Sequence, residues 1–315
     1  MLGSPFAERR GGSRSAVAFE QQSPVILKLA KRWRGLEPGP TPDPRNAIES
    51  AMASSLVLVT GASSGIGAAT ARRFGASGAR VLLLARNKER LGDVANAIRS
   101  AGGSATPYAV DLADAAAIAE LSARVEREAG TPDVLINNAG VGRWLPVAET
   151  TAEEALAMTA VPYLAAFNLT RAFLPKMLVR RSGAIACVTS PASYLVWPSA
   201  GAYTAARHAL LGFTESLRAD LKGTGISVTL VVLGVVESPY WEHNPGSRER
   251  VPAMNPMIAR PLATDEAAEA IFSGVEGGKR VVVKPAIFRA LFLLNAIAPR
   301  LVATQLRRAV TKSSV

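Results

Sequence analysis

The chain has 315 residues, of which 49% are hydrophobic and 19% are charged, enough for one large domain with a sizeable core or for two small ones. No run of about 18 apolar residues occurs, so no membrane-spanning helix is expected. The single cysteine, Cys187, excludes an internal disulfide, and its apolar neighbours favour a buried structural thiol. The only histidines are His208 and His243, so no metal site is predicted.

The formal net charge of +11 is concentrated at the two ends of the chain. Residues 1–51 carry a net charge of +3, and residues 279–315 carry eight Lys and Arg with no Asp or Glu, whereas residues 52–278 are neutral. A neutral body without a nucleic-acid motif argues against nucleic acid as a partner. The basic ends could instead contact an anionic membrane surface.

Residues 1–51 are predicted to form a disordered basic leader. The stretch LEPGPTPDPR cannot form a packed element, and only residues 23–36 have the pattern of a short basic amphipathic helix. The pair Arg9-Arg10 is not followed by an apolar segment, so no export signal is predicted and a cytoplasmic location is expected. Met52 directly precedes the first apolar run, which leaves open a natural start at that residue.

From residue 55 onward, short apolar runs alternate with helical stretches. Strands are predicted at residues 56–60, 80–85, 105–110, 133–138, 184–189, 227–232 and 280–284. Helices are predicted at residues 65–77, 150–180 and 201–222, with others ending near residues 100 and 129. Strands without polar alternation, separated by helices, predict a parallel sheet that is buried on both faces. Right-handed crossovers then give a doubly wound, Rossmann-type α/β fold in a single domain over residues 52–284.

The segment TGASSGIG, residues 60–67, leaves the first strand and opens a helix. Gly61 permits the sharp turn, Gly65 lets the backbone approach a pyrophosphate, and Gly67 permits close packing of helix and sheet. The first N–H groups of the helix and its positive dipole end then favour a phosphate. In this strand–turn–helix setting the segment indicates a dinucleotide site.

The end of the second strand indicates which dinucleotide is bound. A site that prefers NAD places Asp or Glu there to accept hydrogen bonds from the ribose hydroxyls, whereas this chain has Ala85 followed by Arg86. A guanidinium can grip the additional phosphate of NADP with two parallel hydrogen bonds. The sequence therefore favours NADP(H) over NAD(H).

TGASSGIG, NNAG at residues 137–140, Ser190 and Tyr203 follow one another in an order that resembles the short-chain dehydrogenase/reductase family. The resemblance covers about residues 52–284 and implies a nicotinamide cofactor and an active-site tetrad of Asn, Ser, Tyr and Lys. It also implies that Asp111 meets the adenine. The expected cofactor-binding residues are Gly61, Ser63, Ser64, Gly65, Ile66, Gly67, Arg86, Asp111, Leu112, Asn138, Ala139, Gly140, Tyr203, Arg207 and Ser238.

By this resemblance Tyr203 exchanges a proton with the substrate oxygen, and Ser190 orients the carbonyl or alcohol. A phenol titrates near pKa 10, so it needs a nearby positive charge to act near neutrality. The family supplies that charge with a lysine, but the fourth residue after Tyr203 is Arg207. Arginine keeps the charge, yet it is longer and planar and does not release a proton, so the ribose contact and any proton relay are altered.

The asparagine of the tetrad is the second departure. Alignment of residues 161–177 with the corresponding family helix places Pro162 at that position. The family's asparagine distorts this helix and leaves its carbonyl free to hold a relay water. Proline also distorts a helix, because it lacks an N–H, and it retains its own carbonyl. We therefore expect Pro162 to replace the distortion.

The segments after the sixth strand are expected to concern the substrate. Tyr240, Trp241, Met254 and Met257 suggest an apolar lid, with an irregular surface loop as the alternative. The basic, amphipathic tail, residues 285–315, mixes bulky apolar side chains with arginines. Three possibilities remain open for the tail: a cover over the substrate pocket, an oligomer contact, or a surface contact with a membrane.

Together these features predict an NADP(H)-dependent oxidoreductase. Hydride would pass between the nicotinamide and a ketone or secondary alcohol on an apolar or lipid-like small molecule. The alternative, which the two altered tetrad positions support, is an NADP-binding protein of the same fold with little or no catalysis and a sensor or partner-binding role. The resemblance also implies a homo-oligomer formed through the helices at residues 150–180 and 201–222.

Overall fold

The computed structural model describes residues 53–251 and 260–313. The predicted leader and two of the proposed lid residues, Met254 and Met257, lie outside the described residues. No helix in the described part of the chain is long and apolar enough to cross a membrane.

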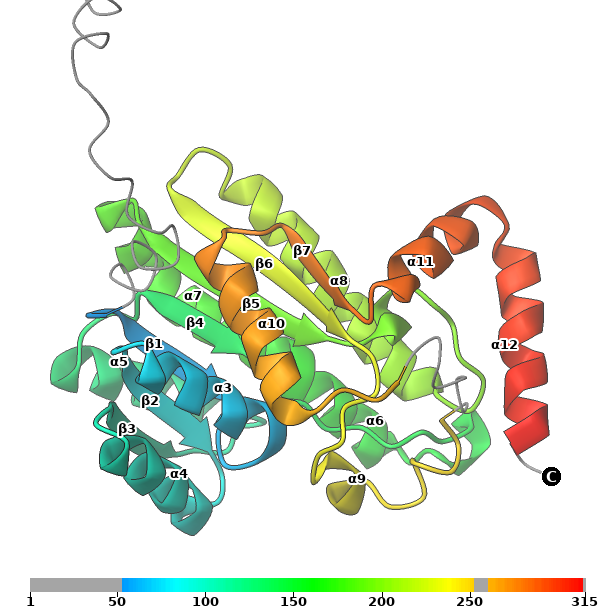
Figure 1. The fold of residues 1–315 in the computed structure, drawn as a ribbon, viewed down its shortest axis with the longest axis horizontal. Coiled ribbons are helices and arrows are strands. Elements are labelled where there is room, and N and C mark those ends of the chain that lie inside the picture. The colour runs from blue at the N-terminus through cyan, green and yellow to red at the C-terminus, as the bar shows by residue number, and fades with distance from the viewer. Residues whose placement is uncertain (1–52, 252–259, 314–315) are drawn as a thin grey trace, which may run out of the picture. The chain divides into compact units, whose positions relative to one another are not determined.

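A seven-stranded parallel sheet with the order β3-β2-β1-β4-β5-β6-β7 forms the centre of the fold (Figure 1). Every adjacent pair of strands runs parallel. The strands are β1 (Leu56–Thr60), β2 (Arg80–Ala85), β3 (Ser104–Ala109), β4 (Val134–Asn137), β5 (Gly183–Thr189), β6 (Ile226–Leu233) and β7 (Val281–Lys284). The predicted doubly wound fold is therefore confirmed, with strand boundaries close to those expected.

Helices cover both faces of the sheet (Figure 1). One layer contains α3 (Gly65–Ala76), α4 (Lys88–Ser100) and α10 (Thr264–Glu276). The other contains α5 (Ala115–Glu128), α7 (Ala165–Arg180) and α8 (Gly201–Asp220). Successive residues of a strand point to opposite faces, so Val57 and Val59 pack in the first layer while Leu56 and Leu58 pack in the second. This explains why the central strands β1 and β4 are buried at every residue.

Shorter elements connect these layers and extend beyond β7. They are η2 (Val147–Glu149), α6 (Ala152–Thr159), η3 (Ala160–Leu164), η4 (Pro191–Ser193), α9 (Tyr240–His243), α11 (Ile287–Ile297) and α12 (Pro299–Ser313). The tail forms two helices, because α11 ends at Ile297 and α12 begins at Pro299. Cys187 is buried in β5, as expected, and burial raises the pKa of its thiol.

Strand order reverses direction between β1 and β4. Chain connections leave these two strands toward opposite sides of the sheet, which opens a crevice at their carboxyl ends. The functional residues proposed from the sequence follow the carboxyl ends of β1, β2, β4 and β5, so the topology brings them to one edge of the sheet.

Candidate active site

A cavity of about 600 Å³ lies at the carboxyl ends of the strands. Every residue predicted to bind the cofactor contributes to its wall, as does Ser190. These residues are Gly61, Ser63, Ser64, Gly65, Ile66, Gly67, Arg86, Asp111, Leu112, Asn138, Ala139, Gly140, Ser190, Tyr203, Arg207 and Ser238. The volume is within the range of pockets that hold cofactors and other small molecules.

The glycine loop is shaped by contacts that exclude side chains. Gly61 has φ +68°, in the left-handed region, which forms the turn out of β1. A Cβ added at Gly67 would lie 2.1 Å from the carbonyl oxygen of Gly61 and 2.7 Å from Nδ2 of Asn138. Gly67 therefore lets the first turn of α3 approach the glycine loop and the end of β4. The sequence had predicted only that Gly67 lets the helix pack closely on the sheet.

Thr60 ties the ends of β1 and β4 together. Its Oγ1 accepts hydrogen bonds from the backbone N–H groups of Asn138 and Ala139, each at 2.9 Å, and donates to the Ile136 carbonyl at 3.2 Å. Asn138 Nδ2 donates in turn to the Thr60 carbonyl at 2.9 Å. Sequence reasoning missed Thr60, because its role depends on the pairing of strands that are distant in the chain.

The end of β2 presents two arginines to the cavity. Arg86 is exposed and lines the wall together with Asn87 and Arg90. The Asn87 side chain caps α4 by accepting the N–H of Arg90 at 2.9 Å, which fixes the start of that helix. Arg90 was missed, although its position four residues after Arg86 was a usable signal. Its Nη1 lies 3.4 Å from Nε2 of His243 on α9.

Asp111 follows β3 and faces the same end of the cavity. Its Oδ1 accepts the N–H of Ala113 at 2.9 Å, which orients the carboxylate. Asp111 thus lies at the carboxyl edge of the sheet, where the sequence predicted it.

Tyr203 and Arg207 are four residues apart on α8 and therefore lie on one face of this helix. The Arg207 guanidinium carbon lies 4.7 Å from the centroid of the Tyr203 ring. Arg207 is only 6% exposed, and its buried Nε has no hydrogen-bond partner among the described residues. A buried guanidinium with an unused donor costs free energy unless a ligand completes its hydrogen bonds.

Gly140 makes room for this arginine. A Cβ at Gly140 would lie 2.9 Å from Nη2 of Arg207, so the guanidinium packs directly against the Gly140 backbone and would have to shift if a larger residue stood there. Gly140 and Arg207 belong to different segments, the loop after β4 and helix α8. The arginine is therefore accommodated by the surrounding chain.

Ser190 follows the carboxyl end of β5. Its Oγ accepts the N–H of Ala192 at 3.2 Å and so caps the short helix η4, which begins with Pro191. The neighbouring hydroxyls of Thr189 and Ser193 are 2.6 Å apart. These contacts fix the turn that presents Ser190 to the cavity.

The helix that contains Pro162 is not regular. Residues Ala160–Leu164 form a π-helical turn between α6 and α7, and Pro162 is buried within this turn. Missing backbone hydrogen bonds at proline and local π-helical geometry are known causes of such irregularity. Val161 lines the cavity but Pro162 does not. The predicted relay role of Pro162 therefore stays a prediction.

Hydrogen bonds fasten the segment after β6 to the loop after β4. Tyr240 Oη donates to the Gly142 carbonyl at 2.5 Å, and Asn244 Oδ1 accepts the Gly142 N–H at 3.0 Å. Ser247 Oγ accepts the Trp144 N–H at 3.0 Å. Asn244 and Ser247 are buried. Polar contacts thus hold this segment in place. Tyr240 and Trp241, two of the residues proposed for an apolar lid, line the cavity.

Tyr240 also lies close to the predicted catalytic pair. Burial raises the pKa of the Tyr240 phenol, and the neighbouring Tyr203 raises it further, while Arg207 acts in the opposite direction. Tyr240 therefore remains protonated over the pH range of ordinary assays, and its hydroxyl acts as a donor.

Aromatic side chains wall the cavity beside Tyr203. The Trp144 ring centroid lies 5.8 Å from that of Tyr203 and 5.9 Å from that of Trp197. Phe288 from α11 also lines the cavity. The analysis of the sequence named none of these three residues, because each comes from a loop or tail whose fold has no periodic signal. Phe288 belongs to the tail, so at least this tail residue lies over the cavity, as one of the three possibilities for the tail proposed.

No group of three or more His, Cys, Asp and Glu that could hold a metal ion occurs among residues 53–251 and 260–313. The cavity can therefore be described from its protein groups: a glycine-rich backbone cradle, two arginines at one end, and a serine, two tyrosines and a buried arginine at the other.

Comparisons with known proteins agree with this geometry. A family model described as short chain dehydrogenase matches residues 55–248. The probable oxidoreductase EphD of Mycobacterium tuberculosis is 34% identical over 257 residues, which are 78% of this chain. This chain spans only 43% of the length of EphD.

Two further proteins match over most of their own length. The rat dehydrogenase/reductase SDR family member 7B is 31% identical over 265 residues, with 82% of each chain covered. A metagenomic short-chain oxidoreductase crystallised with NADP is 33% identical, with 72% of this chain and 94% of that chain covered and a TM-score of 0.61. Solved structures with this fold contain NADP in some cases and NAD in others. By its sequence and its fold, this chain belongs to the short-chain dehydrogenase/reductase family.

Proposed function

We propose that this protein is an NADP(H)-dependent oxidoreductase that interconverts a ketone and a secondary alcohol on an apolar or lipid-like molecule. The observation that carries the proposal is the pair of Tyr203 and Arg207, 4.7 Å apart from ring centroid to guanidinium carbon, in the wall of the cavity that also contains the glycine loop. The family membership of the chain supports oxidoreductase chemistry.

A dinucleotide fits the residues present. The cradle around Gly67 has no room for a Cβ, and the unpartnered Nε of Arg207 offers a buried donor. Gly61, Gly65 and the first N–H groups of α3 would hold the pyrophosphate, and Arg207 would bond the nicotinamide ribose. Bound NADPH supplies hydride to the carbonyl carbon.

The preference for NADP(H) rests on the end of β2. Arg86 and Arg90 both line the cavity there, and the sequence Ala85-Arg86-Asn87 contains no carboxylate that would repel a ribose phosphate. Two guanidinium groups favour a phosphate dianion at this position. A metagenomic relative with bound NADP lends support to this preference.

The proton chemistry is assigned to side chains of this chain. Ser190 Oγ–H donates a hydrogen bond to the substrate carbonyl and so polarises it. As hydride reaches the carbonyl carbon, Tyr203 Oη–H gives its proton to the carbonyl oxygen, and an alcohol forms. The Arg207 guanidinium beside the ring stabilises the phenolate that remains until solvent restores the proton. The distorted helix at Pro162 would leave backbone carbonyls available to such a proton path.

The substrate class is proposed from the wall beside Tyr203. Trp144, Trp197, Tyr240 and Phe288 provide a largely apolar surface with few hydrogen-bonding groups. A surface of this kind favours a molecule with a bulky hydrocarbon part next to its carbonyl.

Substitution of Tyr203 by Phe tests the proposal. We expect turnover with NADPH and a ketone to fall by ~10²- to 10⁴-fold, because the proton donor is lost, while NADPH affinity stays within about twofold. Tyr108→Phe is the matched control, since its hydroxyl bonds Glu128 at 3.0 Å and does not line the cavity. Undiminished turnover in Tyr203→Phe would refute the assignment, and tight NADPH binding without turnover in the unsubstituted protein would favour a binding protein instead.

We also propose self-association through α7 and α8. Phe167, Leu178 and Val179 are exposed apolar side chains on α7, and Leu164 precedes them on the π-helical turn. Phe167→Asp is expected to shift the particle mass in analytical ultracentrifugation toward that of the monomer. An unchanged mass would place any oligomer contact elsewhere.

A further inference from the structure

Helix α11 presents an apolar face to solvent. Leu293 is 65% exposed and Ile297 is 74% exposed, and Ile287 and Leu294 are exposed beside them. Leu301 on α12 is also exposed. Large apolar side chains that are exposed together on one helix mark a contact site.

The opposite face of α11 is firmly packed. Phe288 is buried in the core, and the ring of Phe292 stacks on that of Tyr194 with centroids 4.4 Å apart. Asn295 Nδ2 donates to the Tyr194 carbonyl at 3.0 Å. The outward apolar face therefore belongs to a helix that is already docked on the fold.

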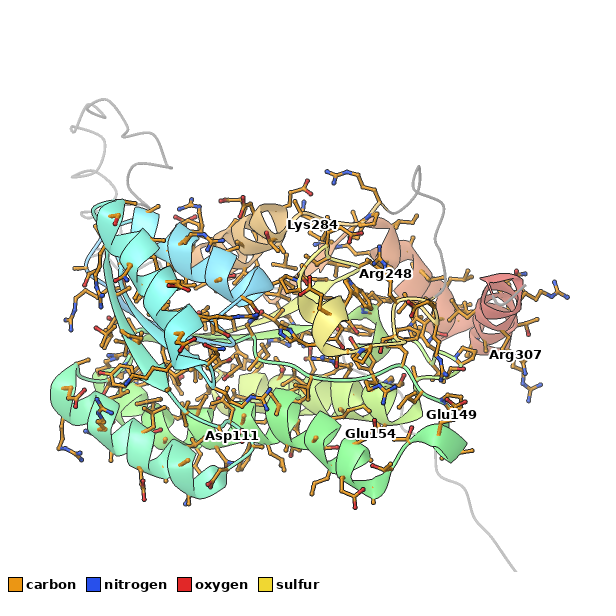
Figure 2. All side chains as sticks on the ribbon, turned by 90° about the horizontal axis from the view of Figure 1, so that it is seen from below. Asp111, Glu149, Glu154, Arg248, Lys284 and Arg307 are labelled. Atoms are coloured by element: carbon orange, nitrogen blue, oxygen red, sulfur yellow. The ribbon has the colours of Figure 1, made fainter. Side chains whose placement is uncertain are left out.

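Exposed cations lie on the same two helices. Exposed Arg289 lies on α11, and exposed Arg300, Arg307 and Arg308 lie on α12. The sequence contains no Asp or Glu from residue 279 to residue 315. Arg289 and Arg300 form no ion pair with any described residue. Figure 2 shows Arg307 on α12 at the margin of the protein.

A surface groove adjoins the same cations. Val196, Trp197 and Pro198 form one side, and Arg300, Ala303, Thr304 and Arg307 of α12 form the other. Its wall is therefore apolar with guanidinium groups beside it, a combination that suits a hydrocarbon chain with an anionic head group. Trp197 also lines the cavity of the proposed active site.

We propose that α11 and α12 dock on an anionic lipid membrane, with Leu293, Leu294, Ile297 and Leu301 in the interfacial layer and the arginines at lipid phosphates. Amphipathic helices with a basic polar face bind anionic bilayer surfaces in this way. A second copy of the chain fits this surface less well, because a symmetric contact would bring two acid-free, cationic segments together. The proposal stands independently of the catalytic one.

Co-sedimentation of the full chain with vesicles tests the proposal. We expect binding to vesicles of phosphatidylcholine with phosphatidylglycerol, much weaker binding to phosphatidylcholine alone, and a decrease as salt rises. Leu293→Ser with Ile297→Ser should weaken binding about tenfold or more, because two exposed apolar side chains lose their contact with the interface. Arg289→Glu with Arg300→Glu should weaken it about tenfold or more.

Matched controls separate this surface from general surface properties. Val147→Ser with Leu156→Ser removes side chains that are 77% and 66% exposed in η2 and α6, and Arg72→Glu with Lys222→Glu reverses two exposed charges elsewhere. Both controls should bind vesicles like the unsubstituted protein. NADPH affinity, measured on every variant, reports whether the fold is intact.

Three outcomes would overturn the proposal. The first is no difference between anionic and neutral vesicles for the unsubstituted chain. The second is an equal loss of vesicle binding in the controls. The third is a fall in particle mass on Leu293→Ser with Ile297→Ser while vesicle binding is unchanged, which would assign the apolar face to a second copy of this chain.

Discussion

The two ends of the cavity are built differently. The end with the glycine loop is formed where strands stop: Gly61 follows β1, Arg86 follows β2 and Asn138 follows β4. The end around Tyr203 is walled by loop and tail residues such as Trp144 and Phe288. Strand ends are fixed by backbone pairing across the sheet, whereas the aromatic wall is fixed by side-chain packing and by a few hydrogen bonds. The first end therefore depends on the topology of the sheet, and the second depends on how the loops and the tail pack.

Gly67→Ala tests the strand-end side of this comparison. Gly67→Ala places a methyl group where the Gly61 carbonyl lies, 2.1 Å away, so loop and helix must separate. We expect strain of ~1–3 kcal/mol and NADPH binding weakened by ~10- to 100-fold, measured by isothermal titration calorimetry.

Gly92→Ala in α4 is the matched control for Gly67→Ala. A Cβ at Gly92 meets nothing within 4 Å, so that substitution should leave NADPH binding unchanged and raise stability by ~0.5–1 kcal/mol. Equal NADPH affinity in both variants would contradict the cradle described for Gly67.

Arg207 belongs to the end around Tyr203 and packs against Gly140 in the loop after β4. Arg207→Lys restores the residue type usual in the family but leaves the space beside Gly140 unfilled and removes donors. We expect kcat to fall about tenfold and NADPH to bind more weakly, because a charged hydrogen bond is worth ~1.5–3 kcal/mol. Steady-state kinetics on a substrate ketone would measure both effects. A large rise in kcat would mean that Arg207 impairs this site.

Arg86→Ala tests which cofactor the glycine-loop end of the cavity prefers. We expect the affinity for NADPH to fall about fivefold to tenfold while the affinity for NADH is unchanged, since only NADPH carries the additional phosphate. Arg90→Ala, read in the same titration, shows whether the second guanidinium contributes. Equal losses for both cofactors would remove Arg86 from the phosphate site.

Tyr240→Phe tests the loop-built end and should have the smallest effect. It removes the 2.5 Å hydrogen bond to the Gly142 carbonyl, which is worth ~0.5–1.5 kcal/mol, so KM for the ketone should rise by ~2- to 10-fold. Because burial raises the Tyr240 pKa, this phenol stays protonated and the ratio of KM values should not change between about pH 6 and pH 9. A ratio that changes with pH in this range would show that Tyr240 titrates during turnover.

The same contrast explains what could be predicted from the sequence. Apolar runs located β1 to β7, and the glycine spacing located the cavity, because both signals are local. Thr60 and the room that Gly140 leaves for Arg207 depend on segments that are 78 and 67 residues apart, so no local pattern contains them. The contact between the tilted rings of Trp144 and Tyr203 is likewise a tertiary contact between a loop and a helix.

The distortion at Pro162 was predictable in part, because it has both a local and a tertiary cause. The missing N–H of proline predicted an irregular helix, and a π-helical turn occupies Ala160–Leu164. Which backbone carbonyl faces the cavity could not be predicted, because it depends on how the turn packs against α8. Val161, rather than Pro162, reaches the wall.

Ketone-dependent oxidation of NADPH by the full, unsubstituted chain tests the central claim most directly. A panel of ketones that ranges from small to long-chain or polycyclic would be assayed by the absorbance of NADPH, with the affinity for NADPH measured on the same sample. We predict tight NADPH binding and consumption that requires an added ketone, strongest for the more apolar ones. Tight NADPH binding without turnover on any ketone, or on any secondary alcohol with NADP⁺, would contradict the claim that Tyr203 and Arg207 form a working site.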